Sequence, residues 1–228
     1  LPADPGNEGL GKGWAKPEFN DSSWPLMELP STWQATGCQF SGVLWFRKEI
    51  DIPKEWAGRD LNLCIGTIDK TDISYFNGEQ VGATGSGFDE SSWNQPRCYL
   101  VPGRLVKEGR NLVAVRVYSF IFDGGLRGPR KKMSASLSSA PEDNSISLAG
   151  SWRFAVEHNF GIVAGQTVPQ TPGPGNPNTP HILFDNMIAP LMPYAIRGAI
   201  WYQGESTDQK AGEYFQLLKN MLRSWRRR

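Results

Sequence analysis

The stretch "GVLWFRKEIDI" at residues 42–52 decides the fold of this chain. Its apolar and polar residues nearly alternate, as is typical of a strand that buries one face. Similar runs follow at residues 60–66 ("DLNLCIG"), 72–82 ("DISYFNGEQVG") and 111–120 ("NLVAVRVYSF"). Asn77 and Gly78 give the strongest hairpin signal in the sequence. Since no long helical pattern interrupts these runs, residues 14–120 predict an antiparallel sandwich of the jelly-roll type.

The composition is that of an ordinary globular protein. Of the 228 residues, 39% are hydrophobic and 21% are charged, and the formal net charge is +1. A nearly balanced charge argues against nucleic acid and the membrane surface as partners, and no apolar stretch is long enough to span a bilayer. The three cysteines, Cys38, Cys64 and Cys98, lack the spacing of a metal site. We therefore expect small buried apolar residues there, without a disulfide framework or zinc.

The chain is predicted to have three parts. Residues 1–130 form the β-sandwich. Residues 131–181 combine a strand pair in "ISLAGSWRFAVEHNF" with the tract "VPQTPGPGNPNTPH", whose Pro, Gly and Asn content is typical of a linker. Residues 182–228 read as a helix, a strand and a second helix. The fold class is therefore mainly β with an α/β tail.

The α/β tail contains the first candidate site. Residues 199–202 ("AIWY") are continuously apolar, which is typical of a strand buried on both faces of a parallel sheet. Gln203, Gly204 and Glu205 follow directly, and ligands of open α/β sheets bind at the carboxyl ends of strands. Helical spacing then begins and includes Tyr214, Leu217, Leu218, Met221, Leu222 and Trp225. One strand cannot make a sheet, so either another chain provides the other strands or, as we expect, the chain is a piece of a longer protein.

The stretch "LFDNMIAPLMPYAIRGAIWYQGES" at residues 183–206 resembles a block of the sialate O-acetylesterases, in their SGNH-type α/β hydrolase domain. "NGEQVG" and "GGLRGP" are similar to the galactose-binding-like sandwich inserted in that family. The resemblance implies a carbohydrate esterase that removes O-acetyl groups from sialic acid or a related sugar through a serine acyl-enzyme. Its partners would be the O-acetylated sugar and the missing remainder of the hydrolase domain.

The same resemblance assigns roles at the strand tip. Gln203 would stabilise the oxyanion, Gly204 would allow close backbone approach, and Glu205 would support them. The family's "GQSN" serine and "DxxH" pair are absent, so this chain alone is expected to be inactive. The mechanism requires no cofactor and no metal. An enzyme that meets such glycans is usually exported, which favours a periplasmic or extracellular location.

A second hypothesis is a non-catalytic carbohydrate-binding module or an accessory domain of a glycoside hydrolase. The chain has nine tryptophans, and flat aromatic faces stack on sugar rings. Four residues of the sandwich are candidates for sugar contact because they combine aromatic faces with polar groups: Trp45, Arg47, Trp93 and Asp123. Trp45 and Arg47 lie two apart on one strand and so share a face, which suits a core as well as a surface.

Overall fold

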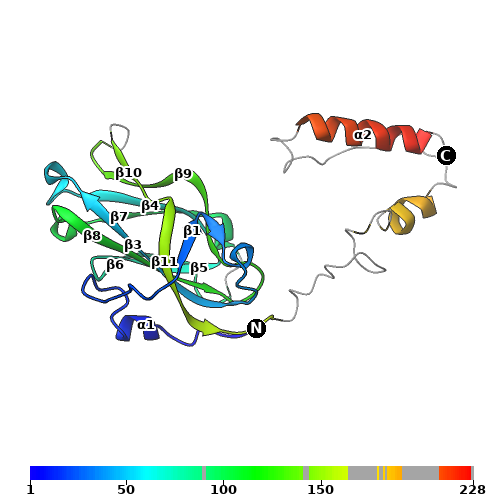
Figure 1. The fold of residues 1–228 in the computed structure, drawn as a ribbon. Coiled ribbons are helices and arrows are strands. Elements are labelled where there is room, and N and C mark those ends of the chain that lie inside the picture. Colours follow the sequence, from blue (N-terminus) through cyan, green and yellow to red (C-terminus); the bar gives the residue numbers. More distant parts are fainter. Residues whose placement is uncertain are drawn as a thin grey trace. The chain divides into compact units, whose positions relative to one another are not determined.

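The computed structural model describes residues 1–88, 91–140, 144–163, 179, 182, 184–191 and 211–226. They separate into two compact units, Leu1–Thr167 and Val168–Arg228. The first unit is a sandwich of two antiparallel sheets (Figure 1). The mainly β prediction is therefore confirmed.

The larger sheet has six strands in the spatial order β1 (Leu26–Leu29), β11 (Gly150–Asn159), β3 (Gly42–Ile52), β8 (Gly109–Ser119), β5 (Thr71–Phe76) and β6 (Glu79–Thr84). The smaller sheet has the order β10 (Ser145–Ser147), β9 (Gly125–Leu137), β4 (Leu61–Asp69) and β7 (Pro96–Val101), and β2 (Ser31–Thr32) also pairs with β9. Short helices join them: α1 (Glu8–Gly11), η1 (Gln34–Thr36), η2 (Lys54–Trp56), η3 (Ser92–Asn94) and η4 (Gly103–Leu105).

Strands β3 and β8 pair along their whole length, from Gly42 opposite Ser119 to Ile52 opposite Gly109. Because side chains alternate along a strand, Leu44 and Phe46 of β3 face the second sheet. They pack there with Val113, Val115 and Val117 of β8 and with Leu61, Leu63 and Ile65 of β4. The alternation seen in residues 42–52 and 111–120 thus builds the core between the two sheets.

The opposite face of β3 and β8 is also buried, because the N-terminal cover (residues 2–24) lies over it. The Arg116 guanidinium pairs with the Asp4 carboxylate at 2.7 Å and with the Glu157 carboxylate at 2.9 Å. Glu157 also accepts a hydrogen bond from the backbone N–H of Glu8 at 2.7 Å. Two charged contacts therefore fasten the cover to β8 and β11.

The chain does not divide at residue 130 as the sequence suggests. Strand β9 runs through that position, and β11 lies inside the larger sheet between β1 and β3. The polar run at residues 131–139 resembled the end of a domain because polar residues outnumber apolar ones there, although residues 135–137 are buried. The sandwich therefore includes the strand pair that was expected to follow it.

Cys64 and Cys98 form a disulfide, with 3.9 Å between their Cα atoms. This corrects the expectation of unpaired, buried cysteines, which holds only for Cys38, a free and partly buried thiol. The two residues are 34 apart in sequence, but the pairing of β4 with β7 places them opposite each other. Cysteine spacing alone does not reveal such a pairing.

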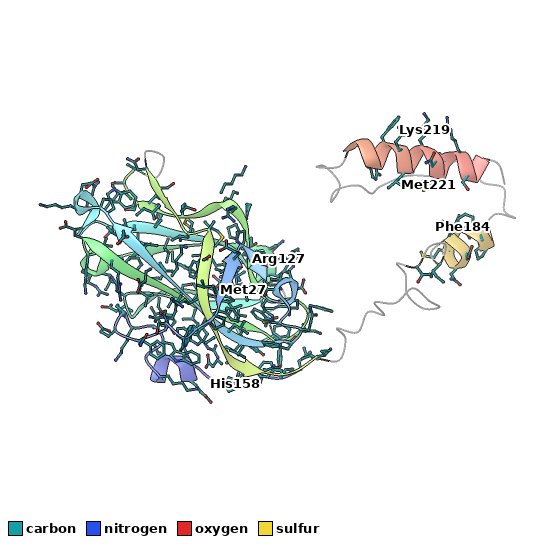
Figure 2. All side chains as sticks on the ribbon, in the orientation of Figure 1. Met27, Arg127, His158, Phe184, Lys219 and Met221 are labelled. Atoms are coloured by element: carbon teal, nitrogen blue, oxygen red, sulfur yellow. A yellow bond between two sulfur atoms is a disulfide. The ribbon has the colours of Figure 1, made fainter. Side chains whose placement is uncertain are left out.

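The second unit contains η5 (Phe184–Ile188), η6 (Ala189–Leu191) and α2 (Ala211–Arg226). The helical spacing after residue 210 is confirmed by α2, on which Lys219 and Met221 point to different sides (Figure 2). The predicted strand at 199–202 and the linker at 168–178 lie outside the described residues. Within the described part of the chain, no helix has the length and apolar character needed to cross a membrane.

The disulfide predicts a simple labelling pattern. A thiol reagent applied to the denatured, unreduced protein should modify one cysteine, Cys38, because a disulfide sulfur is not a nucleophilic thiolate. After reduction the same reagent should modify all three. Intact mass spectrometry checks this, and three labels before reduction would contradict the pairing.

The fastening of the N-terminal cover predicts a pH dependence of stability. Burial tends to raise the pKa of Asp4, but the hydrogen bond and charge of Arg116 outweigh it, so the folded-state pKa lies below the usual value of 3.8. This contribution to stability is present above that value and is lost as the pH falls through the folded pKa. Asp4→Asn should cost about 1 kcal/mol at pH 6, since the carboxylate is partly exposed, and less at pH 3.

Urea unfolding at the two pH values measures this difference. Glu18→Gln is the matched control, because Glu18 is exposed and has no ion pair in the described part of the chain. An equal cost of Asp4→Asn at both pH values would show that its charge does not hold the cover.

Candidate functional site

Two of the four residues proposed for sugar contact, Trp93 and Asp123, line one open pocket of about 360 Å³. They come from η3 and from the loop between β8 and β9. The remaining lining residues come from the β4–β5 turn, the same β8–β9 loop and the start of β9: Asp69, Lys70, Phe122 and Arg127. We call this the aromatic pocket.

Charges in the aromatic pocket are arranged around Asp69. Its carboxylate accepts from the Lys70 ammonium at 2.9 Å and from the Arg127 guanidinium at 3.1 Å. Arg127 belongs to β9 and is labelled in Figure 2. Its guanidinium also lies 5.4 Å from the centre of the Trp93 ring, a cation–π distance. The carboxylate therefore holds two cations in place beside the aromatic side chains.

The aromatic side chains of this pocket are exposed: Trp93 by 44% and Phe122 by 48%. The Lys70 ammonium lies 5.7 Å from the centre of the Phe122 ring. Lys70 and Phe122 also have left-handed backbone, with φ of 73° and 60°. Such a conformation costs energy for residues other than glycine, and it concentrates at functional sites.

A buried hydrogen-bond network lies directly beneath the pocket. Arg97 of β7 is fully buried and pairs with the Asp72 carboxylate at 2.8 Å. It also donates to the carbonyl oxygens of Lys70, at 2.7 Å, and of Ser92. The Ser92 hydroxyl donates to that Lys70 carbonyl at 2.7 Å. One guanidinium thus joins the turn that carries Lys70 to the turn that carries Trp93.

Asp72 and Tyr99 complete this network. Burial raises the pKa of Asp72, and the charge and hydrogen bond of Arg97 oppose that rise. The Tyr99 hydroxyl donates to the Asp72 carboxylate at 2.9 Å, and burial followed by the nearby carboxylate raises the pKa of Tyr99. The tyrosine therefore remains a neutral donor, and the carboxylate has partners on several sides.

The structure does not place Trp45 and Arg47 at this pocket. Trp45 is 0% exposed and stacks on Tyr75, with 5.4 Å between ring centres. Arg47 is 2% exposed, and its guanidinium binds the Asp21 carboxylate at 2.6 Å. Their role in sugar contact is corrected: both lie beneath the N-terminal cover, which the strand alternation does not reveal. Gln203, Gly204 and Glu205 lie outside the described residues.

The sequence did not point to four lining residues of the aromatic pocket: Asp69, Lys70, Phe122 and Arg127. Phe122 and Arg127 flank the pair Gly124 and Gly125, and that turn signal could have drawn attention to them. Gly124 packs against the Trp33 ring so closely that a Cβ atom would lie 2.0 Å from it. Asp69 and Lys70 gave no such signal, because a charged pair at the end of a strand is common.

The chain matches no protein-family model and no curated protein. Part of it is similar to parts of several solved glycosidases. For Bacteroides uniformis beta-glucuronidase 2, bound to cyclophellitol-6-carboxylate aziridine, the identity is 21% and the TM-score 0.42, over 62% of this chain and 15% of that one. For a Ruminococcus gnavus beta-glucuronidase the identity is 19% and the TM-score 0.42, and the match covers 67% of this chain and 27% of that one. For a Bacteroides vulgatus beta-glycosidase the identity is 18% and the TM-score 0.40, and the match covers 67% of this chain and 18% of that one.

These matches correct the resemblance to the sialate O-acetylesterases. The solved structures are beta-glucuronidases and a beta-glycosidase, which are glycoside hydrolases and not carboxylic ester hydrolases. The expected esterase activity and its acyl-enzyme rested on that resemblance and are corrected with it, whereas the SGNH assignment of residues 182–228 is not confirmed. The matched part spans less than a third of each of these chains.

The buried network predicts the effect of removing Arg97. Arg97→Met leaves the Asp72 carboxylate buried without its counter-charge, so we expect a loss of about 3–5 kcal/mol in the free energy of unfolding. Adding Asp72→Asn should restore part of this loss, because the buried charge is then gone. Urea unfolding of the single and double variants measures both the loss of stability and the part that is restored. A cost below about 1 kcal/mol for Arg97→Met would show that the guanidinium does not join the two turns.

Proposed function

We propose that residues 1–167 form a jelly-roll domain that binds carbohydrate without catalysing a reaction, as an accessory domain of a glycoside hydrolase. The observation that carries this proposal is the aromatic pocket, where the exposed Trp93 and the exposed Asp123 line the same hollow. That a longer protein containing this domain is a glycoside hydrolase is likewise part of the proposal.

The chemistry of the aromatic pocket suits a sugar ring. Exposed aromatic rings offer flat apolar faces to the C–H surface of a sugar, and polar groups at the rim fix its orientation. The Asp123 carboxylate can accept hydrogen bonds from sugar hydroxyls, while the Lys70 ammonium and the Arg127 guanidinium can donate them. Because Asp69 already holds both cations, the pocket is largely ordered before a ligand arrives, which lowers the entropy cost of binding.

A location outside the cytosol forms part of this proposal. The Cys64–Cys98 disulfide supports it, because structural disulfides persist mainly in oxidising compartments. A domain in such a compartment can bind glycans outside the cell.

The test begins with a glycan array probed with the purified chain, followed by calorimetry with the sugar that binds best. Trp93→Ala should weaken binding about tenfold, since stacking on an exposed ring contributes on the order of 1 kcal/mol. Phe215→Ala is the matched control, because it removes an exposed ring from α2, in the other unit.

A silent array, or equal binding by the Trp93→Ala variant and the wild type, would refute the proposal. Equal loss in the Phe215→Ala variant would also count against it, because the effect would then not belong to the aromatic pocket.

A further inference from the structure

We infer that the outer face of the five-stranded sheet holds a second binding site, for a glycan that carries carboxylate or sulfate groups. This site is separate from the aromatic pocket and does not rest on the function proposed for it. We call it the basic groove. It is built on β4, β7 and β9, and its ligand would have to be anionic.

The basic groove has a volume of about 400 Å³. No Asp or Glu and no aromatic residue is found among the residues that line it: Asn62, Cys64, Gly66, Thr67, Pro96, Arg97, Cys98, Gly128, Pro129, Lys131, Lys132, Ser134 and Ser136. The aromatic pocket, by contrast, contains two carboxylates and two exposed rings. The two hollows therefore suit ligands of different charge.

A bulge in β9 carries the charge of the groove. Thr67 pairs with Gly128 and Ile65 with Met133, so residues 129–132 lie opposite Gly66 alone. All four bulge residues are exposed. Gly66 is required there, because its φ is +76° and a Cβ atom would lie 2.9 Å from the Gly128 backbone. Bulges of this kind redirect side chains and occur often beside binding sites.

The bulge presents three consecutive cations, Arg130, Lys131 and Lys132. Within the described part of the chain none of them has a carboxylate within 4 Å, whereas Arg127 on the same strand is held by Asp69. On β3, burial lowers the pKa of Lys48; the charge of Glu28 opposes this fall and the charge of Arg130 adds to it. Unpaired cations beside a hollow without carboxylates create a local positive potential.

The floor of the groove adds neutral donors. Asn62 lies opposite Ser136 and Cys64 opposite Ser134, so an amide and two hydroxyls sit on neighbouring positions of β4 and β9. The side chains of Asn62, Ser134 and Ser136 make no hydrogen bond to other described residues. An anionic ligand could therefore receive charge from the lysines and hydrogen bonds from the floor, which is the combination that binds oxyanions.

The groove favours an acidic glycan over a nucleic acid. Single-stranded nucleic acids bind where bases can stack on aromatic side chains, and the lining of this groove has none. A glycan needs hydroxyl and amide contacts as well as charge, and the floor supplies them.

The test measures binding of the full chain to polygalacturonate, which carries carboxylates, to dextran sulfate, and to uncharged dextran. Lys131→Ser with Lys132→Ser should weaken binding of at least one anionic polymer about tenfold, as expected for two lost charge contacts. Lys54→Ser with Lys107→Ser is the matched control, because it removes the same charge from exposed sites outside the groove. We expect that control to change the affinity less than about twofold.

Two further variants separate a site from general charge attraction. Ser134→Val removes a floor donor and should weaken binding without changing the net charge. Trp93→Ala should have no effect, because that ring belongs to the aromatic pocket.

Preference for polygalacturonate or for dextran sulfate identifies the oxyanion that the groove binds. Equal losses in the two double lysine variants, equal affinity for uncharged dextran, or no binding of either anionic polymer would overturn the proposal.

Discussion

The ladder between β3 and β8 is the constraint on which the rest of the sandwich depends. Its eleven paired positions fix two buried faces at once. Leu44 and Phe46 face the second sheet and define the core, while Trp45 and Arg47 face the N-terminal cover. A shift by one residue would exchange these two sets, so the register is held by packing from both sides. The remaining strands extend the sheet from this pair.

The sequence predicted the sandwich correctly because one face of each strand is apolar, and alternation records that asymmetry. It could not predict the N-terminal cover, since residues 2–24 form few regular elements and act through isolated contacts such as Asp4 with Arg116. A strand buried on both faces by side chains of mixed polarity has no distinctive periodicity. This is why Trp45 and Arg47 looked like candidates for a surface site. The end of the sandwich was misplaced for a related reason, because β9 is exposed and polar where it bulges.

The aromatic pocket was half visible in the sequence. Trp93 and Asp123 stood out as residue types suited to sugar, but Asp69, Lys70 and Arg127 join them only through pairing of strands far apart in the chain. The buried guanidinium of Arg97 is harder still to foresee, because an arginine in a strand is normally exposed. Its partners are one carboxylate and three backbone carbonyl oxygens, those of Lys70, Ser92 and Gln95. The geometry of the pocket is thus set by a residue outside it.

The position of β11 has a consequence for the order in which the protein can assemble on a ribosome. β1 pairs with β11, and the α1 region is bonded to Glu157 on that same strand. Strand β1 therefore lacks its pairing partner, and α1 lacks its Glu157 contact, until residues 150–159 have emerged. Until then the larger sheet lacks β11 and the β1 edge that pairs with it, and the Trp45 indole lacks its Glu157 acceptor. Such long-range closure slows folding and leaves apolar surface open to chaperones in the meantime.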